Sequence, residues 1–261
     1  MLAPRKVAGD TTCLGGYLPV PGLGLIACNA FLLQSTEPVL VDTGLLPLRE
    51  QFLEQLRAEL PLWEIRWIWL THVDPDHTGA LDAILQEAPK AKVITTFIGL
   101  AKLDLQMRAP PPERVYLLNA GERLDVGDRQ LLAQAPPTFD APETTGLLDS
   151  RTGAFFSADS FGAVLPEPSL RATDVDPLQL RQGCLTWARI DAPWLGMVDR
   201  AAFERSLEFV RRLAPPWVLS SHLPPAQGMV DTLLDHLADA PAAAPFVGPN
   251  QEAFLAMMPA S

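Results

Sequence analysis

Residues 71–80, THVDPDHTGA, contain four side chains that can bind metal ions within a span of six residues. They are His72, Asp74, Asp76 and His77. Imidazole nitrogens and carboxylate oxygens are common ligands of zinc, iron and manganese. Alternate residues at the end of an extended segment share a face, so we expect His72, Asp74 and Asp76 to converge. Four such groups on one short loop favour two adjacent ions over a single ion.

An acidic helix N-terminus is the alternative explanation of this segment. The helix dipole favours aspartate in the first turn, and for Asp76 alone this explanation is as good as the metal site. For the cluster as a whole we favour the metal site. Only four histidines occur in the chain, at positions 72, 77, 222 and 236. Any further imidazole ligand must therefore come from this small set.

The composition excludes several other classes of protein. A net charge of −11 would repel a phosphate backbone, so we expect no nucleic-acid partner. The early apolar stretch is broken by proline, glycine and asparagine, and the first ten residues lack the apolar core of a signal peptide, so we expect no membrane span. The three cysteines form no C-x-x-C pair, which argues against a disulfide framework and a zinc ribbon and favours a cytoplasmic location.

Strand and helix patterns alternate in both halves of the chain. We expect strands or hairpins at residues 29–42, 67–70, 92–97, 115–134, 147–157 and 217–222, and helices at residues 46–60, 80–88, 199–214 and 229–240. The many prolines of residues 163–198 predict a long loop or lid. We predict one domain over residues 1–240 and an Ala/Pro-rich tail over residues 241–261.

Four segments together resemble the metallo-β-lactamase superfamily. They are VLVDTG at 39–44, THVDPDHTGA at 71–80, FFSADSFG at 155–162 and LSSHLPP at 219–225. The resemblance extends over roughly residues 20–225 and implies an α/β fold, the αββα sandwich, in which two mixed sheets lie face to face with helices outside. It also implies that Asp159 and His222 join the ligands of the 71–80 loop.

One branch of this superfamily, the flavodiiron proteins, is the most similar. Most hydrolases of the superfamily have histidine where this chain has Asp74, whereas flavodiiron proteins have a carboxylate there. The stretch Asp140-Ala141-Pro142-Glu143-Thr144 resembles their His-Trp-Pro-Glu-Thr stretch, with Asp140 in place of the histidine. The alternative explanation of Asp140 is a turn residue two positions before a proline, and we favour the ligand.

Carried over residue by residue, the resemblance implies two ligand sets that share a bridging Asp159. The first metal would take His72, Asp74, Asp140 and Asp159, and the second would take Asp76, His77, Asp159 and His222. Asp42, Thr71 and Glu143 would support these ligands from outside. We expect no catalytic residue beyond the ligands themselves.

The ligand chemistry favours iron. Four carboxylates and three neutral imidazoles carry a charge of −4, which balances two divalent ions. Hard oxygen ligands favour iron or manganese over a zinc site built from imidazole and thiolate. We therefore expect two metal ions, with iron preferred and manganese or zinc as alternatives.

The resemblance implies binding or reduction of oxygen or nitric oxide at a di-iron site. Residues 223–261 are too few for the FMN-binding domain that follows this domain in flavodiiron proteins. We therefore expect a small or diatomic ligand and, for redox activity, a separate electron donor. Two alternatives stay open: a hydrolase of esters, thioesters or lactones that uses a metal-bound hydroxide, and a non-catalytic oxygen sensor or carrier. Homodimer formation also stays open.

Overall fold

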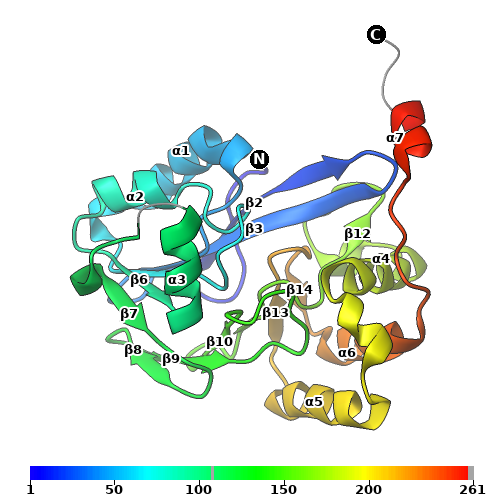
Figure 1. Cartoon of the computed structure of the whole chain (residues 1–261). Helices are drawn as coiled ribbons and strands as arrows, with labels where there is room; N and C mark the ends of the chain where they lie inside the picture. The colour runs from blue at the N-terminus through cyan, green and yellow to red at the C-terminus, as the bar shows by residue number, and fades with distance from the viewer. Residues whose placement is uncertain (107–108, 258–261) are drawn as a thin grey trace.

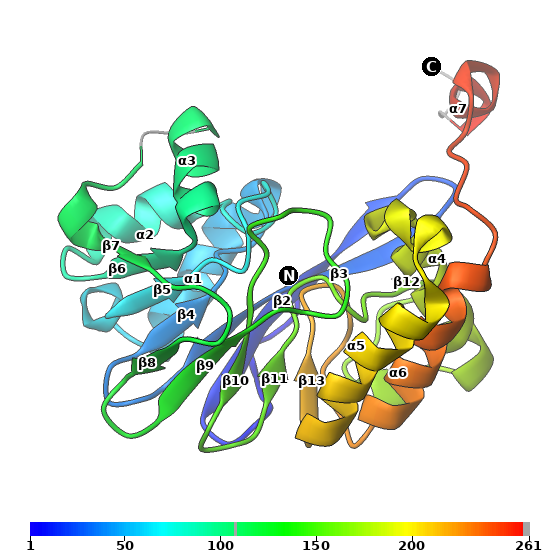
Figure 2. The same cartoon turned by 60° about the horizontal axis from the view of Figure 1, so that its bottom comes forward.

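Two mixed β-sheets lie face to face in this protein, with helices against both outer faces (Figures 1 and 2). The computed structural model describes residues 1–106 and 109–257. Within these residues, one sheet has 8 strands and the other has 6. The predicted αββα sandwich is confirmed.

The first sheet is formed mainly by the N-terminal half of the chain. Its strands are β1 (Arg5–Lys6), β2 (Thr11–Val20), β3 (Gly24–Leu33), β4 (Val39–Val41), β5 (Trp67–Trp69), β6 (Lys92–Thr95), β7 (Val115–Leu117) and β12 (Val164–Leu165). They follow the order β1-β2-β3-β4-β5-β6-β7, and β12 pairs with β3. Strands β4 to β7 are parallel, so the loops that follow β4 and β5 leave the same edge of the sheet.

The second sheet is formed by the C-terminal half. Its strands are β8 (Arg123–Asp125), β9 (Gln130–Gln134), β10 (Gly146–Asp149), β11 (Phe155–Phe156), β13 (Trp217–Leu219) and β14 (Ala226–Gln227). All neighbouring pairs are antiparallel except β11 and β13, which run parallel with Phe156 opposite Leu219. The loops after β11 and β13 therefore leave the same edge.

Alternation along the strands sends side chains to different layers. Ile68 of β5 joins the core between the first sheet and its helices, whereas Trp69 faces the second sheet. In β11, Phe156 packs edge-on against Phe31 across the two sheets, and Phe155 faces the other helical layer. Successive side chains of a strand point to opposite faces of the sheet, so each of these strands contributes to two cores.

Six helices of the described residues cover the outer faces, three on each side (Figures 1 and 2). The first sheet is covered by α1 (Arg49–Glu59), α2 (Leu81–Glu87) and α3 (Phe97–Gln106), and the second by α4 (Pro177–Asp191), α5 (Arg200–Leu213) and α6 (Val230–Asp239). The Asp199 side chain caps α5 by accepting a hydrogen bond from the Ala202 amide, as its sequence position favours.

The prediction of a loop or lid over residues 163–198 is wrong, because α4 occupies its centre. Pro177 stands at the first helical position, where the missing N–H would have no intrahelical partner. The Asp176 side chain accepts hydrogen bonds from the amides of Leu178 and Gln179 and caps the helix. The prolines of this region therefore mark the limits of a helix. Helix α3 was also absent from the sequence prediction, which placed residues up to 97 in a strand.

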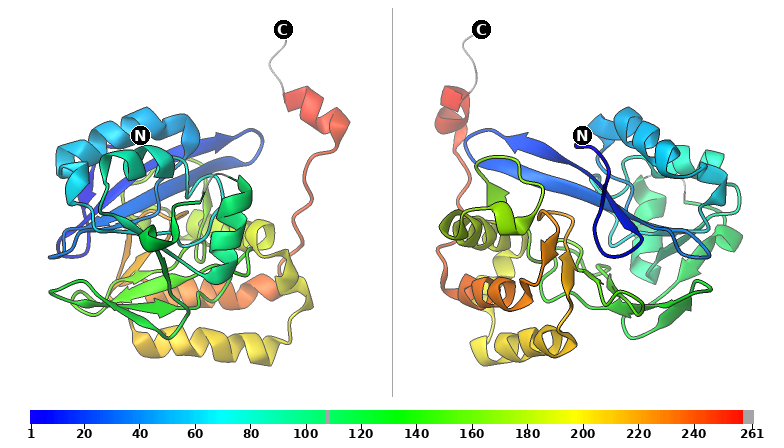
Figure 3. Two further views of the ribbon diagram at one scale, coloured as in Figure 1. Left: turned by 60° about the vertical axis from the view of Figure 1, so that its left-hand side comes forward. Right: turned by 180° about the vertical axis from the view of Figure 1, so that it is seen from behind.

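The predicted tail contains a short helix, α7 (Gln251–Met257), at the end of an extended segment that runs along the molecule (Figures 1 and 3). Met257 lies close to Gly22, in the turn of the β2–β3 hairpin. Residues 258–261 of the predicted tail lie outside the described residues. No helix among the described residues is long and apolar enough to cross a membrane.

Candidate metal centre

Strand register brings together loops that are far apart in the sequence. Phe156 and Leu219 are partners in the β11–β13 pair, and Asp159 and His222 each follow three residues later. Val41 and Trp69 are partners in the β4–β5 pair, which places Asp42 next to the 71–80 loop. The candidate ligands therefore meet at one edge of the sandwich, on loops that follow strands.

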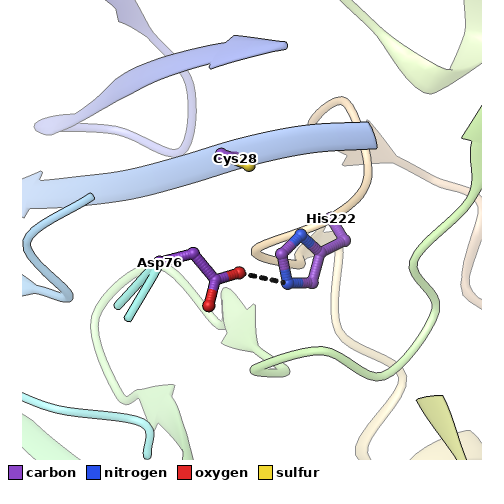
Figure 4. Close-up of side chains that lie close together, drawn as sticks. All are labelled: Cys28, Asp76 and His222. Atoms are coloured by element: carbon purple, nitrogen blue, oxygen red, sulfur yellow. Dashed lines mark ion pairs between the residues drawn. The ribbon is translucent and has the colours of Figure 1, made fainter. Parts of the chain in front are cut away.

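Four of the predicted ligands form a compact group, which we call the second position: Asp76, His77, Asp159 and His222. Nε2 of His77 and Nε2 of His222 each lie 3.3 Å from Asp159 Oδ1. Asp76 Oδ2 lies 3.6 Å from the same nitrogen of His77 and 3.4 Å from that of His222 (Figure 4). Two imidazole nitrogens and two carboxylate oxygens thus surround one point.

The first position contains His72, Asp74, Asp140 and Asp159. His72 Nε2 lies 3.7 Å from Asp159 Oδ2 and 3.9 Å from Asp140 Oδ1. One ligand atom each of His72, Asp74 and Asp140 lie within 4.8 Å of one another. The chain turns after Asp74, because the amides of His77 and Thr78 donate to its carbonyl oxygen. Asp74 and Asp76 therefore face different positions, unlike the shared face expected from an extended segment.

The Asp159 carboxylate faces both positions. Its Oδ1 lies 3.3 Å from two imidazole nitrogens of the second position, and its Oδ2 lies 3.7 Å from His72 of the first. The side chain is 6% exposed. A carboxylate with one oxygen toward each of two ligand sets is the geometry that a bridging ligand requires.

In two histidines, the Nδ1 atom, which points away from the centre, lies beside a hydrogen-bond acceptor. His77 Nδ1 lies 2.9 Å from Asp42 Oδ2, and His222 Nδ1 lies 2.7 Å from the carbonyl oxygen of Ala27. Asp42 is itself held by the amide and hydroxyl of Thr71. An acceptor at Nδ1 keeps the proton there and leaves Nε2 free to bind a metal ion. Asp42 and Thr71 thus lie where sequence reasoning expected supporting residues.

Without a cation, the charges of the second position shift one another's pKa values strongly. Burial lowers the pKa of both His77 and His222, but neighbouring carboxylates outweigh it and hold both well above the ordinary value. Burial raises the pKa of Asp159 and of Asp76, but the histidines outweigh it, and both values fall below the ordinary range. The apo site is therefore a buried cluster of opposite charges.

Buried atoms without a hydrogen bond test whether this site fits a metal ion. His77 Nε2 and Asp159 Oδ1 are buried, and neither forms a hydrogen bond with the residues described by the structure. Buried polar atoms are normally hydrogen-bonded. Here the two atoms lie 3.3 Å apart and face the same point. The residues fit a cation at the second position.

Lys102 of α3 lies beside the first position. Its ammonium group donates a hydrogen bond to Glu143 and lies 3.7 Å from Asp74 Oδ1. Burial lowers the pKa of Lys102, but Glu143, Asp74 and Asp140 outweigh this and raise it, so the cation persists. Glu143 is 2% exposed and pairs with this lysine. Sequence reasoning did not single out Lys102, because helix α3 was not predicted.

Two further side chains join the centre without having been predicted. Cys28 of β3 offers a sulfur within 4.8 Å of ligand atoms of Asp76 and His222, and Figure 4 shows the three residues together. Asp191, the last residue of α4, offers an oxygen within 4.8 Å of oxygens of Asp140 and Asp159. Burial first, and then the charges of Asp159 and Asp140, raise the pKa of Asp191 to about 8. Neither residue lies in a recognisable ligand motif, so no sequence signal identified them.

Comparison with known proteins places this arrangement in a family. The sequence model of the Metallo-beta-lactamase superfamily matches residues 23–154, just over half of the chain. The chain belongs to this superfamily. The prediction from the four sequence segments is thereby confirmed.

Curated relatives of this chain include a diflavin flavoprotein and flavorubredoxins. The chain is 31% identical to the diflavin flavoprotein A 1 of Synechocystis over 135 residues, which is 51% of this chain and 23% of that protein. It is 26% identical to an anaerobic nitric oxide reductase flavorubredoxin of Vibrio vulnificus over 196 residues, which is 74% of this chain and 39% of the relative. The chain thus spans well under half the length of these curated relatives.

Solved structures of flavodiiron proteins share the fold. The rubredoxin oxygen:oxidoreductase of Desulfovibrio gigas superposes with a TM-score of 0.79 over 90% of this chain and 61% of that one, at 16% identity. The flavodiiron protein of Giardia intestinalis gives 0.77 over 92% of this chain and 59% of that one, at 18% identity. At these identities the likeness establishes the metallo-β-lactamase fold.

Proposed function

We propose that this metallo-β-lactamase domain holds two iron ions and binds and reduces oxygen or nitric oxide with electrons from a separate donor. The observation that carries the proposal is the Asp159 carboxylate, which turns one oxygen toward each of two ligand sets. The named relatives, an oxygen oxidoreductase and nitric oxide reductases, support this chemistry for the domain.

The donor set supports iron over zinc. The two positions share four carboxylates and three imidazoles, a hard set that suits iron or manganese. Two adjacent irons, when bound, supply the one-electron steps that reduction of oxygen or nitric oxide requires. The anionic ligands would favour the oxidised state of the pair and lower its potential.

The chain itself supplies positioning, shielding and an open side. Asp42 and the Ala27 carbonyl orient His77 and His222, while the ring of Trp187 lies 4.4 Å from that of His222 and covers it. The side chains of Asp74 and Asp140 are 37% and 30% exposed. A diatomic ligand would therefore reach the centre from the side of the first position.

The test begins with protein expressed in iron-supplemented medium without added zinc. We expect about two irons per chain by inductively coupled plasma mass spectrometry and a near-ultraviolet absorption band in the aerobic protein. With excess chemical reductant, oxygen or nitric oxide electrodes should record continuous consumption, and the Asp159→Asn variant should abolish it.

Other outcomes separate the alternative functions. An oxygen-dependent spectrum that forms and persists without consumption would indicate a carrier or sensor and remove the reduction step. A colourless zinc protein that hydrolyses an ester, thioester or lactone, with no spectral response to oxygen or nitric oxide, would contradict the proposal.

A further inference from the structure

Three residues follow one another on one face of α4 at intervals of four, and the last two of them reach the metal centre. A Cβ atom on Gly183 would lie 2.3 Å from the Val164 carbonyl oxygen, so glycine permits the helix to contact β12 closely. One turn later, Trp187 donates to the Asp159 carbonyl oxygen at 2.9 Å. A Cβ atom on Gly162 would lie 2.4 Å from the Trp187 ring nitrogen, so that ring is also closely fitted. The next residue on this face is Asp191.

Asp191 lies among the ligands with no partner of its own. One oxygen each of Asp140, Asp159 and Asp191 lie within 4.8 Å of one another. Asp191 Oδ2 is buried and accepts no hydrogen bond from the described residues. Three carboxylates at this separation repel one another, and a metal ion bound to all three would relieve that repulsion.

The separation of these oxygens fits a shared ion. Opposite ligands of an octahedral cation with short metal–oxygen bonds lie about 4.2 Å apart, and adjacent ligands lie closer. The three oxygens lie within 4.8 Å of one another, so small rotations of the side chains would bring them onto one cation. Lys102 does not fill this role, because its ammonium group pairs with Glu143 and Asp74.

We infer that Asp191 is a further metal ligand, which binds the ion of the first position beside Asp140 and Asp159. This inference rests on the proposed binuclear centre. It makes the first position richer in carboxylate than the second, and so more selective for iron or manganese over zinc. It also gives α4 a function, because the face Gly183, Trp187, Asp191 couples the helical layer to the metal.

The experiment titrates metal-free chain with Fe²⁺ alone under anaerobic conditions by calorimetry. The variants are Asp191→Asn, which keeps the shape but loses the charge, and Asp191→Glu, which keeps a carboxylate. Asp104→Asn serves as the matched control, because Asp104 is an exposed aspartate on α3. Melting temperatures are measured with and without Fe²⁺.

We expect the wild-type chain and Asp104→Asn to bind two ions. Asp191→Asn should bind one ion at wild-type affinity and the other at least about tenfold more weakly, by analogy with the loss of an ordinary ligand partner. Asp191→Glu should restore part of the loss. The metal-free melting temperature of Asp191→Asn should equal or exceed that of wild type, because the buried Asp191 Oδ2 accepts no hydrogen bond from the described residues that the substitution would remove, whereas a merely structural role would lower it.

Two results would contradict the inference in different ways. Two ions bound by Asp191→Asn at wild-type affinity would remove Asp191 from the ligand set and leave the proposed function intact. Fewer than two ions bound by the wild-type chain would overturn the binuclear centre itself, and with it this inference.

Discussion

The two positions of the candidate centre differ in enclosure and in chemistry. At the second position, the side chains of His77 and His222 are 2% and 3% exposed, and that of Asp76 is 29% exposed. At the first, Asp74 and Asp140 are 37% and 30% exposed, and Lys102 lies beside them. Under the proposed function, the second position would retain an ion, and the first would meet solvent and a small ligand.

The contacts that hold the Nδ1 atoms of the histidines also differ between the two positions. His77 and His222 are oriented by Asp42 and by a backbone carbonyl at 2.9 and 2.7 Å. Nδ1 of His72 has a looser contact, 3.3 Å from the Thr71 hydroxyl. Rigid outer contacts strengthen metal binding, so we expect the second position to bind its ion more tightly than the first.

The largest effect is expected from Asp159→Asn, the change that affects both positions. The amide keeps one oxygen but turns an NH₂ group toward one ion and removes the shared charge. Metal content should fall from about two ions per chain to less than one by mass spectrometry. Retention of two ions would show that Asp159 does not bridge.

His222→Ala should affect the second position alone, and His77→Ala should behave alike because both residues serve the same ion. Metal content should fall by about half in each variant, measured by mass spectrometry after dialysis. His236→Ala is the control, since that half-buried histidine lies on α6 outside both ligand sets. Two ions per chain in either ligand variant would contradict the assignment.

Asp140→Asn tests the first position and the choice between a ligand and a turn residue. If Asp140 binds metal, the weaker of two Fe²⁺ affinities should drop while the tighter one is unchanged in an anaerobic calorimetric titration. If Asp140 is only a turn residue, asparagine should substitute without loss, because it favours the same turns. The result therefore decides whether the carboxylate in place of histidine still coordinates.

Asp42→Asn should have a smaller and one-sided effect. Loss of the charged acceptor at His77 Nδ1 should weaken the tighter site by about 10- to 100-fold, with the weaker site unchanged. Competition with a metal chelator of known affinity measures this ratio. An equal loss at both sites would mean that Asp42 supports the fold and not one position.

The smallest effect concerns pH and the metal-free chain. The pKa values of His77 and His222 are raised in the folded state, so their contribution to stability is complete below the unfolded value of about 6.5 and is lost as pH rises through the folded value. The melting temperature in chelator should therefore decline from about pH 6.5 upward.

The metal-loaded chain should show the opposite trend, because an ion competes with fewer protons as pH rises. His222→Ala should flatten the decline of the metal-free chain, since it removes one of the two histidines responsible. Melting curves by differential scanning fluorimetry across this range provide the comparison. A metal-free melting temperature that rises with pH would contradict the charge arrangement.

Local patterns predicted most of the fold. The hairpin at residues 29–42, the helix at 199–214 and the strand before His222 are confirmed, because each has a clear period and a capping or turn residue at its end. Helices α3 and α4 were missed for physical reasons. Helix α3 follows β6 with a single residue between them, and the prolines flanking α4 resembled loop signals.

The candidate ligands within motifs were found for the same reason, since each motif is a short contiguous stretch. Asp191, Lys102 and Cys28 were not found, because each lies in a helix or strand and reaches the centre only through packing. A lone aspartate at the end of a helix has no local feature that marks it as a neighbour of Asp159.

The sequence by itself determined which residue types could bind metal and which strands precede them, because motifs and periodicity are properties of neighbouring residues. Only the tertiary structure showed which candidate ligands lie close together. Strand register placed His222 beside Asp159, a turn after Asp74 separated it from Asp76, and helix packing brought Asp191 to the first position. Those distances depend on contacts between distant segments, which no local pattern encodes.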